Sequence, residues 1–576
     1  MKRSNRYRDL LELAIGIGVV LLVLFIGSFT TLRADLTSEK RYTLKDATKE
    51  LVKGLDDVVF VKVYLHGELP ADLRALERAT RELLDELRVY QPDLIQYEFV
   101  DPSASTDEKT RRETYDHLQQ QGLQYSSVRI KQKGVFGEQI VFPGALITYR
   151  EKTLPMQLLK TQLRAPDAEM VNRSINNLEY ELASAISQVT ARRKPKIAFL
   201  QGHGELDDMT VQDIATALSE QYEVSRVRID QQIGALSDKT GNMAVRVNKY
   251  DALVIAQPDS TFPDKDLFII DQFIMNSGRV LWCIDAMNAH LDSLRTQQTS
   301  IATPNELGID HLLFAYGVRI NKDLLLDRSC APIEIFTTPY GNQRKLERFP
   351  FFFEPVLIPQ GTHPIVANID PVHTRFVSSM DTIAVDSVRK TILLTTSPYT
   401  RVLRNPVRVS LSIVEMDMGL EKSGTPNLPV GVLLEGRFRS AFADKLLMKP
   451  EELKAMGYRE WGAPGAQLVI SDGDVIANRV DRAKGMIYML GYDRYARAKI
   501  YGNRELIVNA MNHLLGDREL IGLRARTITL RQLDPQRIVN DRTYWQAVNV
   551  AGPSLGAILL VVGAALLRRR KYANAA

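Results

Sequence analysis

Residues 196–205 read Lys-Ile-Ala-Phe-Leu-Gln-Gly-His-Gly-Glu, in which a short apolar run passes directly into a glycine-rich turn. The run has no alternation of polar and apolar positions, which is typical of a strand buried on both faces. Beyond it the patterns alternate: a helix at 210–221, strands at 224–229 and 252–257, a helix at 264–276 and a strand at 279–285. This order predicts a parallel sheet with helices on both faces.

The ends of these strands are where the sequence places a candidate ligand site. In open parallel sheets, ligands bind at the carboxyl ends of the strands. Gly202, His203, Gly204 and Glu205 follow the first strand, and Asp285 closes the fourth. Their alternative role is structural, with glycines supplying positive φ for a tight turn and His203 capping a helix or bonding the loop. The residues alone leave both roles open.

Catalysis at this edge has little support in the sequence. A nucleophile elbow needs Ser or Cys at the sharp turn after a strand, with a histidine and an acid in reach. Cys283 lies two residues before the end of its predicted strand, which is the wrong place. No Cys or His spacing typical of a metal site occurs, and the Gly-Lys dipeptide of a phosphate-binding loop is absent. We expect a non-enzymatic protein with no metal and no cofactor.

Residues 33–165 are predicted to form a separate domain. Strand patterns at 58–65, 94–100, 127–131 and 139–151 are interleaved with helical patterns at 71–89 and 106–121. The β-α-β-α-β-β order is the thioredoxin-like pattern, but without Cys-x-x-Cys no redox chemistry is expected. A connecting helix at 166–194 is ended by Pro195. The α/β domain, expected to be flavodoxin- or amidotransferase-like, then covers residues 195–520.

The later part of the α/β domain has a looser pattern, with helices expected at 306–316 and 503–515. The aromatic run at 349–353 (FPFFF) is expected to form a small satellite core, with a partner surface as the alternative. Arg437 and Arg439 flank Phe438 in a segment expected to be an exposed loop. The acids of residues 471–474 lack the spacing of a calcium loop and are interpreted as a turn.

The last apolar stretch, residues 547–567, reads AVNVAGPSLGAILLVVGAALL and carries no charge over 21 residues. At about 1.5 Å per residue it spans roughly 30 Å, the hydrocarbon thickness of a bilayer. Tyr544 and Trp545 precede it, and the basic tail at 568–576 marks the cytoplasmic side. We expect a transmembrane helix here, reached by a return linker at 521–546; a buried core helix is the alternative.

A second uncharged run at residues 13–32 follows a basic segment within residues 1–12. We expect an uncleaved anchor, because a signal peptide has a shorter apolar region and a small-residue cleavage site. Both termini are then cytoplasmic, in the inner membrane, and residues 33–546 are periplasmic. The cytoplasmic parts would be too short to bind a nucleotide, so any ATP hydrolysis is expected on another subunit.

Small residues in the two spans suggest helix packing. Gly552 and Gly556 have G-x-x-x-G spacing, and Ala14 with Gly18 has small-x-x-x-small spacing, which lets helices approach closely. Chance occurrence in spans rich in Gly and Ala is the alternative. Pro553 is expected to kink the second helix early.

Composition excludes several classes of function. The chain has 576 residues, of which 45% are hydrophobic and 25% charged, and a net charge of +5. Much of that positive charge lies in the segments flanking the spans, so the external part is near neutral and nucleic-acid binding is not expected. Only Cys283 and Cys330 occur. A buried free thiol is expected at Cys283, with a disulfide between the two as the alternative.

Three blocks of sequence resemble one known family. They are 35–37 (DLT) with 40–44 (KRYTL), 177–182 (NLEYEL) with 194–205 (KPKIAFLQGHGE), and 502–504 (GNR) with 509–517 (NAMNHLLGD). Together they resemble the gliding-motility-associated ABC transporter auxiliary proteins of the GldG type, over nearly the whole chain. The resemblance implies work with a permease subunit and a cytoplasmic ATPase in gliding bacteria, in machinery linked to secretion. It supplies no catalytic residues.

We therefore expect a membrane-anchored, non-enzymatic auxiliary subunit of an ABC-type complex. Its partners would be an ABC permease subunit and, through it, a cytoplasmic ATPase; homo-oligomer formation stays open, and no nucleic acid is expected. The first alternative is an extracytoplasmic receptor that binds a ligand near His203 and Asp285. A hydrolase-like or amidotransferase-like enzyme at the same cleft is the second.

Overall fold

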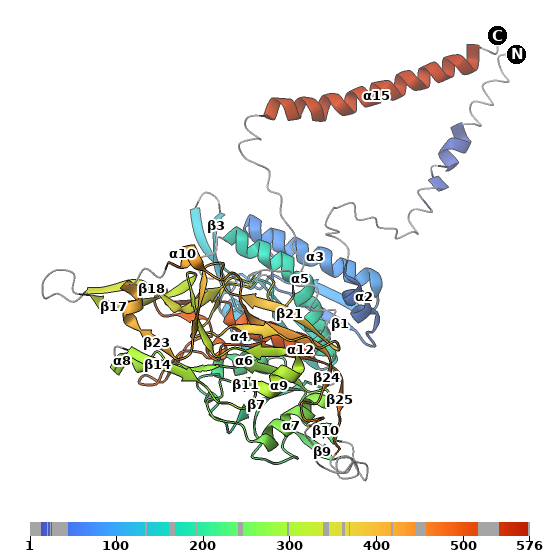
Figure 1. Ribbon diagram of the computed structural model, residues 1–576. Helices are drawn as coiled ribbons and strands as arrows, with labels where there is room; N and C mark the ends of the chain where they lie inside the picture. The colour runs from blue at the N-terminus through green and yellow to red at the C-terminus, as the bar shows by residue number, and fades with distance from the viewer. Residues whose placement is uncertain are drawn as a thin grey trace. The chain divides into compact units, whose positions relative to one another are not determined.

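The computed structural model describes residues 13–19, 21–22, 25, 44–132, 135–159, 167–191, 193–239, 246–296, 299–337, 345–359, 363–367, 369–415, 419–444, 457–516 and 541–573 (Figure 1). The chain forms two compact units, residues 1–526 and 527–576. The first unit contains both helices and strands, and the described part of the second unit is a helix. The predicted return linker at 521–546 lies largely outside the described residues.

The first unit is built on a seven-stranded sheet in the order β21-β24-β25-β12-β11-β7-β8. The strands are β7 (Lys196–Gln201), β8 (Glu223–Arg228), β11 (Ala252–Ala256), β12 (Arg279–Cys283), β21 (Val388–Thr395), β24 (Pro429–Arg439) and β25 (Trp461–Ile470). Five of them, from β8 to β25 in the sheet, run parallel. The predicted parallel sheet is therefore present, and β24 and β21 extend it with antiparallel pairs.

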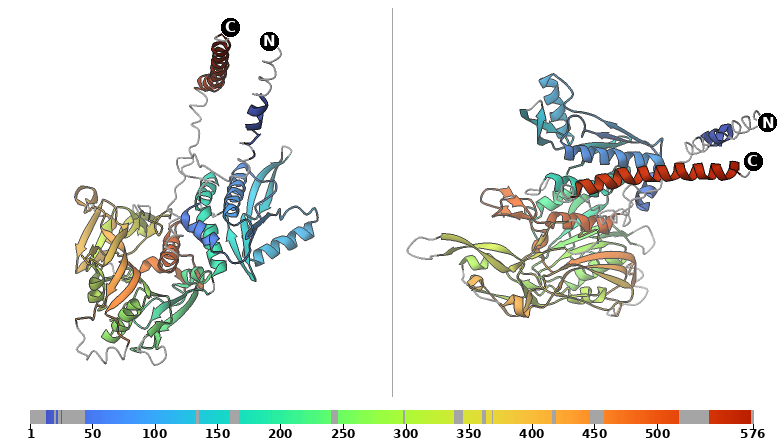
Figure 2. Two further views of the ribbon diagram at one scale, coloured as in Figure 1. Left: turned by 90° about the vertical axis from the view of Figure 1, so that its right-hand side faces the viewer. Right: turned by 90° about the horizontal axis from the view of Figure 1, so that it is seen from above.

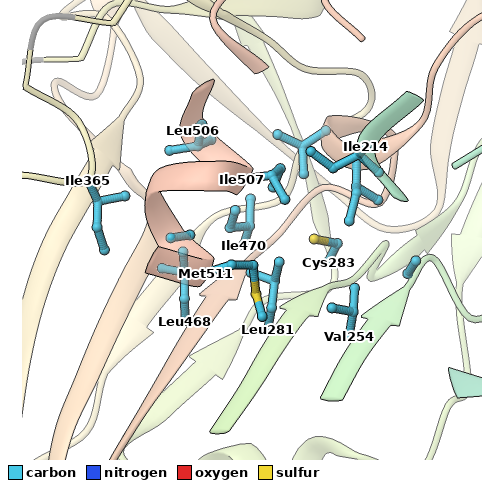
Figure 3. Packing of buried hydrophobic residues seen from close by; sticks show 14 of the residues in the cluster. Ile214, Val254, Leu281, Cys283, Ile365, Leu468, Ile470, Leu506, Ile507 and Met511 are labelled. Carbon is cyan, nitrogen blue, oxygen red and sulfur yellow. The ribbon is translucent and has the colours of Figure 1, made fainter. Parts of the chain in front are cut away.

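Helices cover both faces of this sheet, as the continuous apolar strands require. Alternate strand residues point to opposite sides. On one side Val254, Leu281 and Leu468 pack with α6 (Gln212–Ser219) and α12 (Asn503–Leu515), as Figure 3 shows for Leu506, Ile507 and Met511. On the other side Ile255, Trp282 and Val469 pack with α7 (Asp264–Met275) and α9 (Asp310–Tyr316). Gln467 accepts a hydrogen bond from the indole N–H of the buried Trp282 (3.0 Å).

The segment around Phe438 was expected to be an exposed loop, and that prediction is wrong. Phe438 lies within β24, is only 1% exposed, and contacts the ring of Tyr316 with centroids 5.4 Å apart. The pleat of the strand turns Phe438 into the core and its arginine neighbours outward. The two flanking arginines therefore belong to a strand whose intervening residue, Phe438, is part of the core.

The N-terminal part of the first unit contains a four-stranded sheet in the order β2-β1-β5-β6. Its elements are α2 (Asp46–Lys53), β1 (Val59–Val63), α3 (Ala71–Tyr90), β2 (Ile95–Phe99), α4 (Glu108–Gln120), β3 (Ser126–Gln132), β4 (Val135–Val141), β5 (Gly144–Tyr149) and β6 (Lys152–Gln157). β1 is parallel to β2 and antiparallel to β5. The expected strand at 139–151 is divided at Pro143, because proline interrupts the ladder, and its parts join different sheets. The thioredoxin-like assignment stays a prediction.

The connecting helix α5 (Asp167–Thr190) contacts both parts of the first unit. It runs beside α3 over the four-stranded sheet (Figure 2). Its Tyr180 hydroxyl accepts a hydrogen bond from the Asn512 amide (3.1 Å) on α12, and the oxygen of that amide accepts one from the Tyr222 hydroxyl (2.7 Å). One buried asparagine thus joins α5, α12 and the chain after α6.

Between β12 and β25 the chain makes an excursion that contains β13 to β24, of which β21 and β24 belong to the seven-stranded sheet. The excursion begins with β13 and ends beyond β24, and its hairpin β17 (Cys330–Thr337) and β18 (Lys345–Leu357) pairs further with β19 (Val372–His373). Phe351 and Phe353 are fully buried and pack against Phe376. The predicted satellite core around residues 349–353 is therefore confirmed.

The smaller elements lie in the excursion and in the loops of the seven-stranded sheet. They are β9 (Ser237–Lys239), β10 (Arg246–Asn248), β13 (Met287–Asn288), α8 (Ser293–Thr296), β14 (Thr299–Pro304), β15 (Val318–Ile320), β16 (Asp323–Asp327), β20 (Met380–Thr382), β22 (Thr400–Arg404), β23 (Val407–Ser410), η1 (Leu411–Glu415), α10 (Leu420–Ser423), η2 (Asp474–Ile476), β26 (Val480–Asp481), β27 (Met486–Ile487), β28 (Tyr492–Asp493) and β29 (Ala498–Lys499). Cys283 and Cys330 are both free, so the disulfide alternative is wrong.

The second unit contains α15 (Arg542–Ala573), a helix of 32 residues with Pro553 inside it. Residues 542–567 of this helix are long and apolar enough to cross a membrane, with a mean hydropathy of 2.2 over the most apolar window. Among the described residues it is the one helix that meets this test. Half of the expected first span at 13–32 lies outside the described residues, so two spans are not supported.

The satellite core makes a prediction about stability. Phe353→Ala removes a fully buried ring and should lower the free energy of unfolding by about 3–5 kcal/mol. Phe336→Ala, on the same hairpin but 67% exposed, should change it by less than about 0.5 kcal/mol. Urea unfolding of the full-length protein in detergent measures both. Equal effects of the two variants would contradict a packed core at this hairpin.

Candidate functional site

The turn after β7 is shaped by two glycines in the left-handed region. Gly202 has φ of +119° and Gly204 has φ of +76°. A Cβ atom on Gly204 would lie 1.5 Å from an oxygen of Asp259, so no other residue fits without moving that side chain. The carbonyl of His203 accepts the backbone N–H groups of Asp259 (3.1 Å) and Ser260 (3.0 Å). The turn is thereby fixed to the loop after β11.

His203 is held between two carboxylates inside the protein. Its Nδ1 lies 3.1 Å from Glu205 Oε1, and its Nε2 lies 3.0 Å from Asp266 Oδ2. Its ring is stacked on Phe262, with centroids 4.0 Å apart and planes 12° apart. The side chain is only 5% exposed, and both ring nitrogens are occupied by groups of the chain itself.

This environment favours the charged form of His203. Burial by itself lowers the pKa of the ring, but hydrogen bonds to Glu205 and Asp266 outweigh it and raise the pKa above 6.5. Burial opposes the Glu205 charge too, yet bonds from His203 lower the pKa of Glu205 below 4.5. A stacked ring with no free nitrogen is suited to holding the turn after β7 against Phe262 and α7 rather than to binding a ligand.

Asp285 belongs to a different cluster, formed where β11, β12 and β25 end. Its Oδ1 accepts the backbone N–H of Gly473 (2.5 Å), and its Oδ2 accepts the amide of Gln257 (2.7 Å). Burial, and then the charge of Asp474, raise the pKa of Asp285 to about 7. Burial, and then the charges of Asp474 and Asp285, raise the pKa of the fully buried Asp472 well above its usual range. The sequence identified Asp285 but interpreted residues 471–474 only as a turn.

A pocket of about 320 Å³ opens at this same edge of the sheet. It is bounded by Leu206 after β7, Gln257 after β11 and the segment 474–482 after β25. Residues of the sheet formed by β17, β18 and β19, here called the satellite sheet, lie opposite. This is the place where parallel sheets bind ligands. The pocket, and not the His203 turn, is the accessible feature at the strand ends.

Paired charges form one wall of the pocket. Glu354 is bound by His373 through Nε2 (3.1 Å) and by Arg375 through Nε (3.4 Å). Arg375 also lies 3.6 Å from Asp474, and the His373 ring is stacked on Tyr501 at 4.9 Å. The two acids of this wall therefore share one guanidinium, that of Arg375, and Glu354 also contacts the imidazole of His373.

The opposite wall comes from the segment between β25 and α12, which supplies further arginines and tyrosines. Arg482 pairs with Asp207. Arg479 lies over the ring of Tyr488 (5.6 Å), and Arg494 lies over the ring of Tyr495 (4.5 Å). None of these residues is among the predicted ligand-site residues. The signal was present, because residues 479–501 interleave arginine and tyrosine directly after a strand of the sheet.

The predicted helix-packing residues have no partner within the described part of the chain. Gly552 and Gly556 lie in α15, and an added Cβ at either would meet no heavy atom within 4 Å. Ala14 and Gly18 lie in a described helical stretch and are exposed. Within the described ranges no group of three or more His, Cys, Asp or Glu side chains is placed to hold a metal ion.

The fold and these sites define a class: a large α/β body with a strand-end pocket, in a chain whose C-terminal helix is apolar enough to cross a membrane. Residues 194–510 match the family described as an ABC-type uncharacterized transport system. The chain belongs to this family, whose match covers the seven-stranded sheet, the excursion and most of α12. Residues 38–148 match a domain of unknown function.

Individual relatives add little to the family. An uncharacterized protein of Borreliella burgdorferi is 19% identical over 451 residues, which cover 77% of this chain and 80% of that protein. A solved structure described as the mmIFT52 N-terminal domain is 10% identical and covers 56% of this chain and 98% of its own. Its TM-score is 0.31, which is too low to carry an argument about fold or function.

The His203 cluster makes a prediction about pH. A folded pKa above 6.5 means that the charged ring stabilises the fold fully below pH 6.5, and that this contribution is lost as the pH rises through the folded pKa. His203→Gln leaves two buried carboxylates without a cation and should cost about 3 kcal/mol near pH 6. The cost should shrink at higher pH.

His66→Gln is the matched control, because His66 also pairs with a carboxylate, Glu77 (2.8 Å), but is 45% exposed. Denaturant unfolding of each variant from pH 5.5 to 8.5 measures the difference from the wild type. A cost for His203→Gln that does not change with pH would show that the ring contributes packing and not charge.

Proposed function

We propose that this protein is a membrane-anchored, non-enzymatic auxiliary subunit of an ABC-type transport complex. The observation that carries the proposal is the family match over residues 194–510 in a chain that also contains an apolar helix of membrane-spanning length. The expected partners are a permease subunit in the membrane and, through it, a cytoplasmic ATPase. The sequence has no Gly-Lys dipeptide and so no phosphate-binding loop of its own.

The flanks of α15 support anchoring and a direction. Tyr544 and Trp545 lie at one end of the apolar segment and are exposed, as side chains at a membrane interface would be. Arg569 and Arg570 lie at the other end and are exposed too. The basic end belongs in the cytoplasm, so the large α/β body lies in the periplasm, anchored to the inner membrane. A second span at residues 13–32, with both termini cytoplasmic, is part of the proposal and rests on the sequence alone.

The link to gliding motility and secretion rests on the resemblance of three sequence blocks to GldG-type proteins. The family match supports the transporter role without naming its cargo. Deletion of the gene in a gliding host tests the link: loss of surface spreading, restored by the wild-type gene, is the expected result. Normal spreading would confine the function to transport.

A receptor role for the periplasmic body is the second candidate function, and the strand-end pocket is the observation that favours it. The residues first expected to bind the ligand are less suited to it, because His203 and Asp285 are both bonded to groups of the chain. An auxiliary subunit that senses a ligand in the periplasm is compatible with both roles. An enzyme at the same edge has no further observation in its favour.

The proposal predicts which partners the protein retains. Full-length protein extracted in a gentle detergent should recover a multi-span permease and an ATPase, identified by mass. Gly552→Leu with Gly556→Leu fills the small-residue face of α15 and should weaken this recovery at least tenfold.

Ala557→Leu is the matched control, because position 557 lies about 100° around the helix from Gly556. It should leave recovery unchanged. Recovery of the protein alone, under conditions that preserve other membrane complexes, would contradict the auxiliary role. Intact recovery with the double variant would remove the glycine face from the proposal but keep the subunit assignment.

A further inference from the structure

We propose that the strand-end pocket binds a small organic anion, with Arg479 and Arg494 balancing its carboxylate or phosphate group. The proposal stands on the geometry and charge of the pocket and does not depend on the transporter assignment. The pocket volume of about 320 Å³ is of the size that small-molecule sites have in proteins.

Contacts within the chain reduce the negative charge that the acids of the pocket present to an anion. Glu354 is held by His373 and Arg375, and Asp474 lies beside the same Arg375. Asp493 accepts the backbone N–H groups of Tyr495 (2.9 Å) and Ala496, so it is directed into its own turn. The carboxylates are thereby committed to the walls.

Two arginines of the pocket form no direct ion pair within the described residues, although Arg494 lies close enough to Glu354 to help lower the pKa of that acid. Arg482 is paired with Asp207, but no carboxylate of the described residues pairs with Arg479 or Arg494. Each lies instead over a tyrosine ring. A cation–π contact positions a guanidinium without neutralising it, so its remaining N–H groups can bind a carboxylate or phosphate.

The tyrosines of the pocket are fixed in place and offer ring surface to the rest of the ligand. The Tyr495 hydroxyl accepts the backbone N–H of Glu334 (2.8 Å) and is contacted by Arg494. Tyr501 is stacked on His373. Tyr492 and the exposed Met489 line the same space. A carboxylate or phosphate joined to a ring or short apolar chain fits this combination better than an inorganic ion alone.

The test compares charged and neutral probes on the full-length protein in detergent. Benzoate represents an organic carboxylate, phenyl phosphate an organic phosphate, and benzamide is the neutral analogue of benzoate. Binding to the folded protein raises the temperature of unfolding as the probe concentration increases. We expect benzoate, phenyl phosphate or both to raise it, and benzamide to have no effect; the more effective anion identifies the headgroup.

Variants then locate the site. Arg479→Gln with Arg494→Gln should weaken the apparent affinity at least tenfold, while the conservative pair Arg479→Lys with Arg494→Lys should retain part of it. Arg404→Gln removes an exposed arginine that does not line the pocket and should change nothing. Because both pocket arginines are exposed, the variants should unfold at the wild-type temperature without probe.

Three results would overturn the proposal: no stabilisation by either anion, equal stabilisation by benzamide, or an unchanged response in the double glutamine variant. A response lost equally in Arg404→Gln would show a general charge effect and overturn it as well. None of these results bears on the recovery of a permease and an ATPase, so the two proposals fail separately.

Discussion

The structure depends on the pairing of β12 with strands from distant parts of the chain. β12 lies between β11, which precedes it closely, and β25, which begins only at Trp461, and it is parallel to both. Both of its faces are buried, so its backbone hydrogen bonds and its side chains are satisfied only when both neighbours are present. The chain between residues 284 and 460 must therefore leave this edge and return to it. On the way it adds β21 and β24 to the sheet, and it forms the sheet of β17, β18 and β19 that faces the strand ends across the pocket.

The sequence predicted the elements whose pattern is local. α12 is found at Asn503–Leu515, as expected, and β7 and β11 lie within one residue of their predicted bounds. The predictions that were wrong involve contacts over long separations. Phe438 is buried because the pleat of β24 directs it at Tyr316, which no local pattern around the two arginines indicated. The antiparallel extension of the sheet by β24 and β21 was likewise hidden, because the order of strands in a sheet is not written in their periodicity.

A general rule of parallel sheets indicated the edge of the pocket, but the sequence did not indicate the residues that line it. The rule that ligands bind at the carboxyl ends of parallel strands pointed to the edge at which the pocket opens, yet it selected the most conspicuous residues there. His203 has a structural role there, because it bonds the buried carboxylate of Asp266. Asp285 has one too, because it accepts the backbone N–H of Gly473 and so supports that turn. The pocket residues come from the excursion, as Arg375 does, and from the segment after β25, as Arg494 does. Only the pairing of β12 with β25 brings those two segments together.

The late arrival of β25 also bears on how the chain is made. Synthesis proceeds from the N-terminus, so β7, β8, β11 and β12 are complete long before residues 461–470 exist. Until then β12 presents an unpaired edge of apolar residues, which is the kind of surface that leads nascent chains to associate wrongly. The delay arises because the whole excursion must be made before β25 exists. The entropic cost of closing so long a loop is small by comparison, because it grows only slowly with the number of residues in the loop. A nascent chain halted within the excursion would therefore still have β12 without its partner β25.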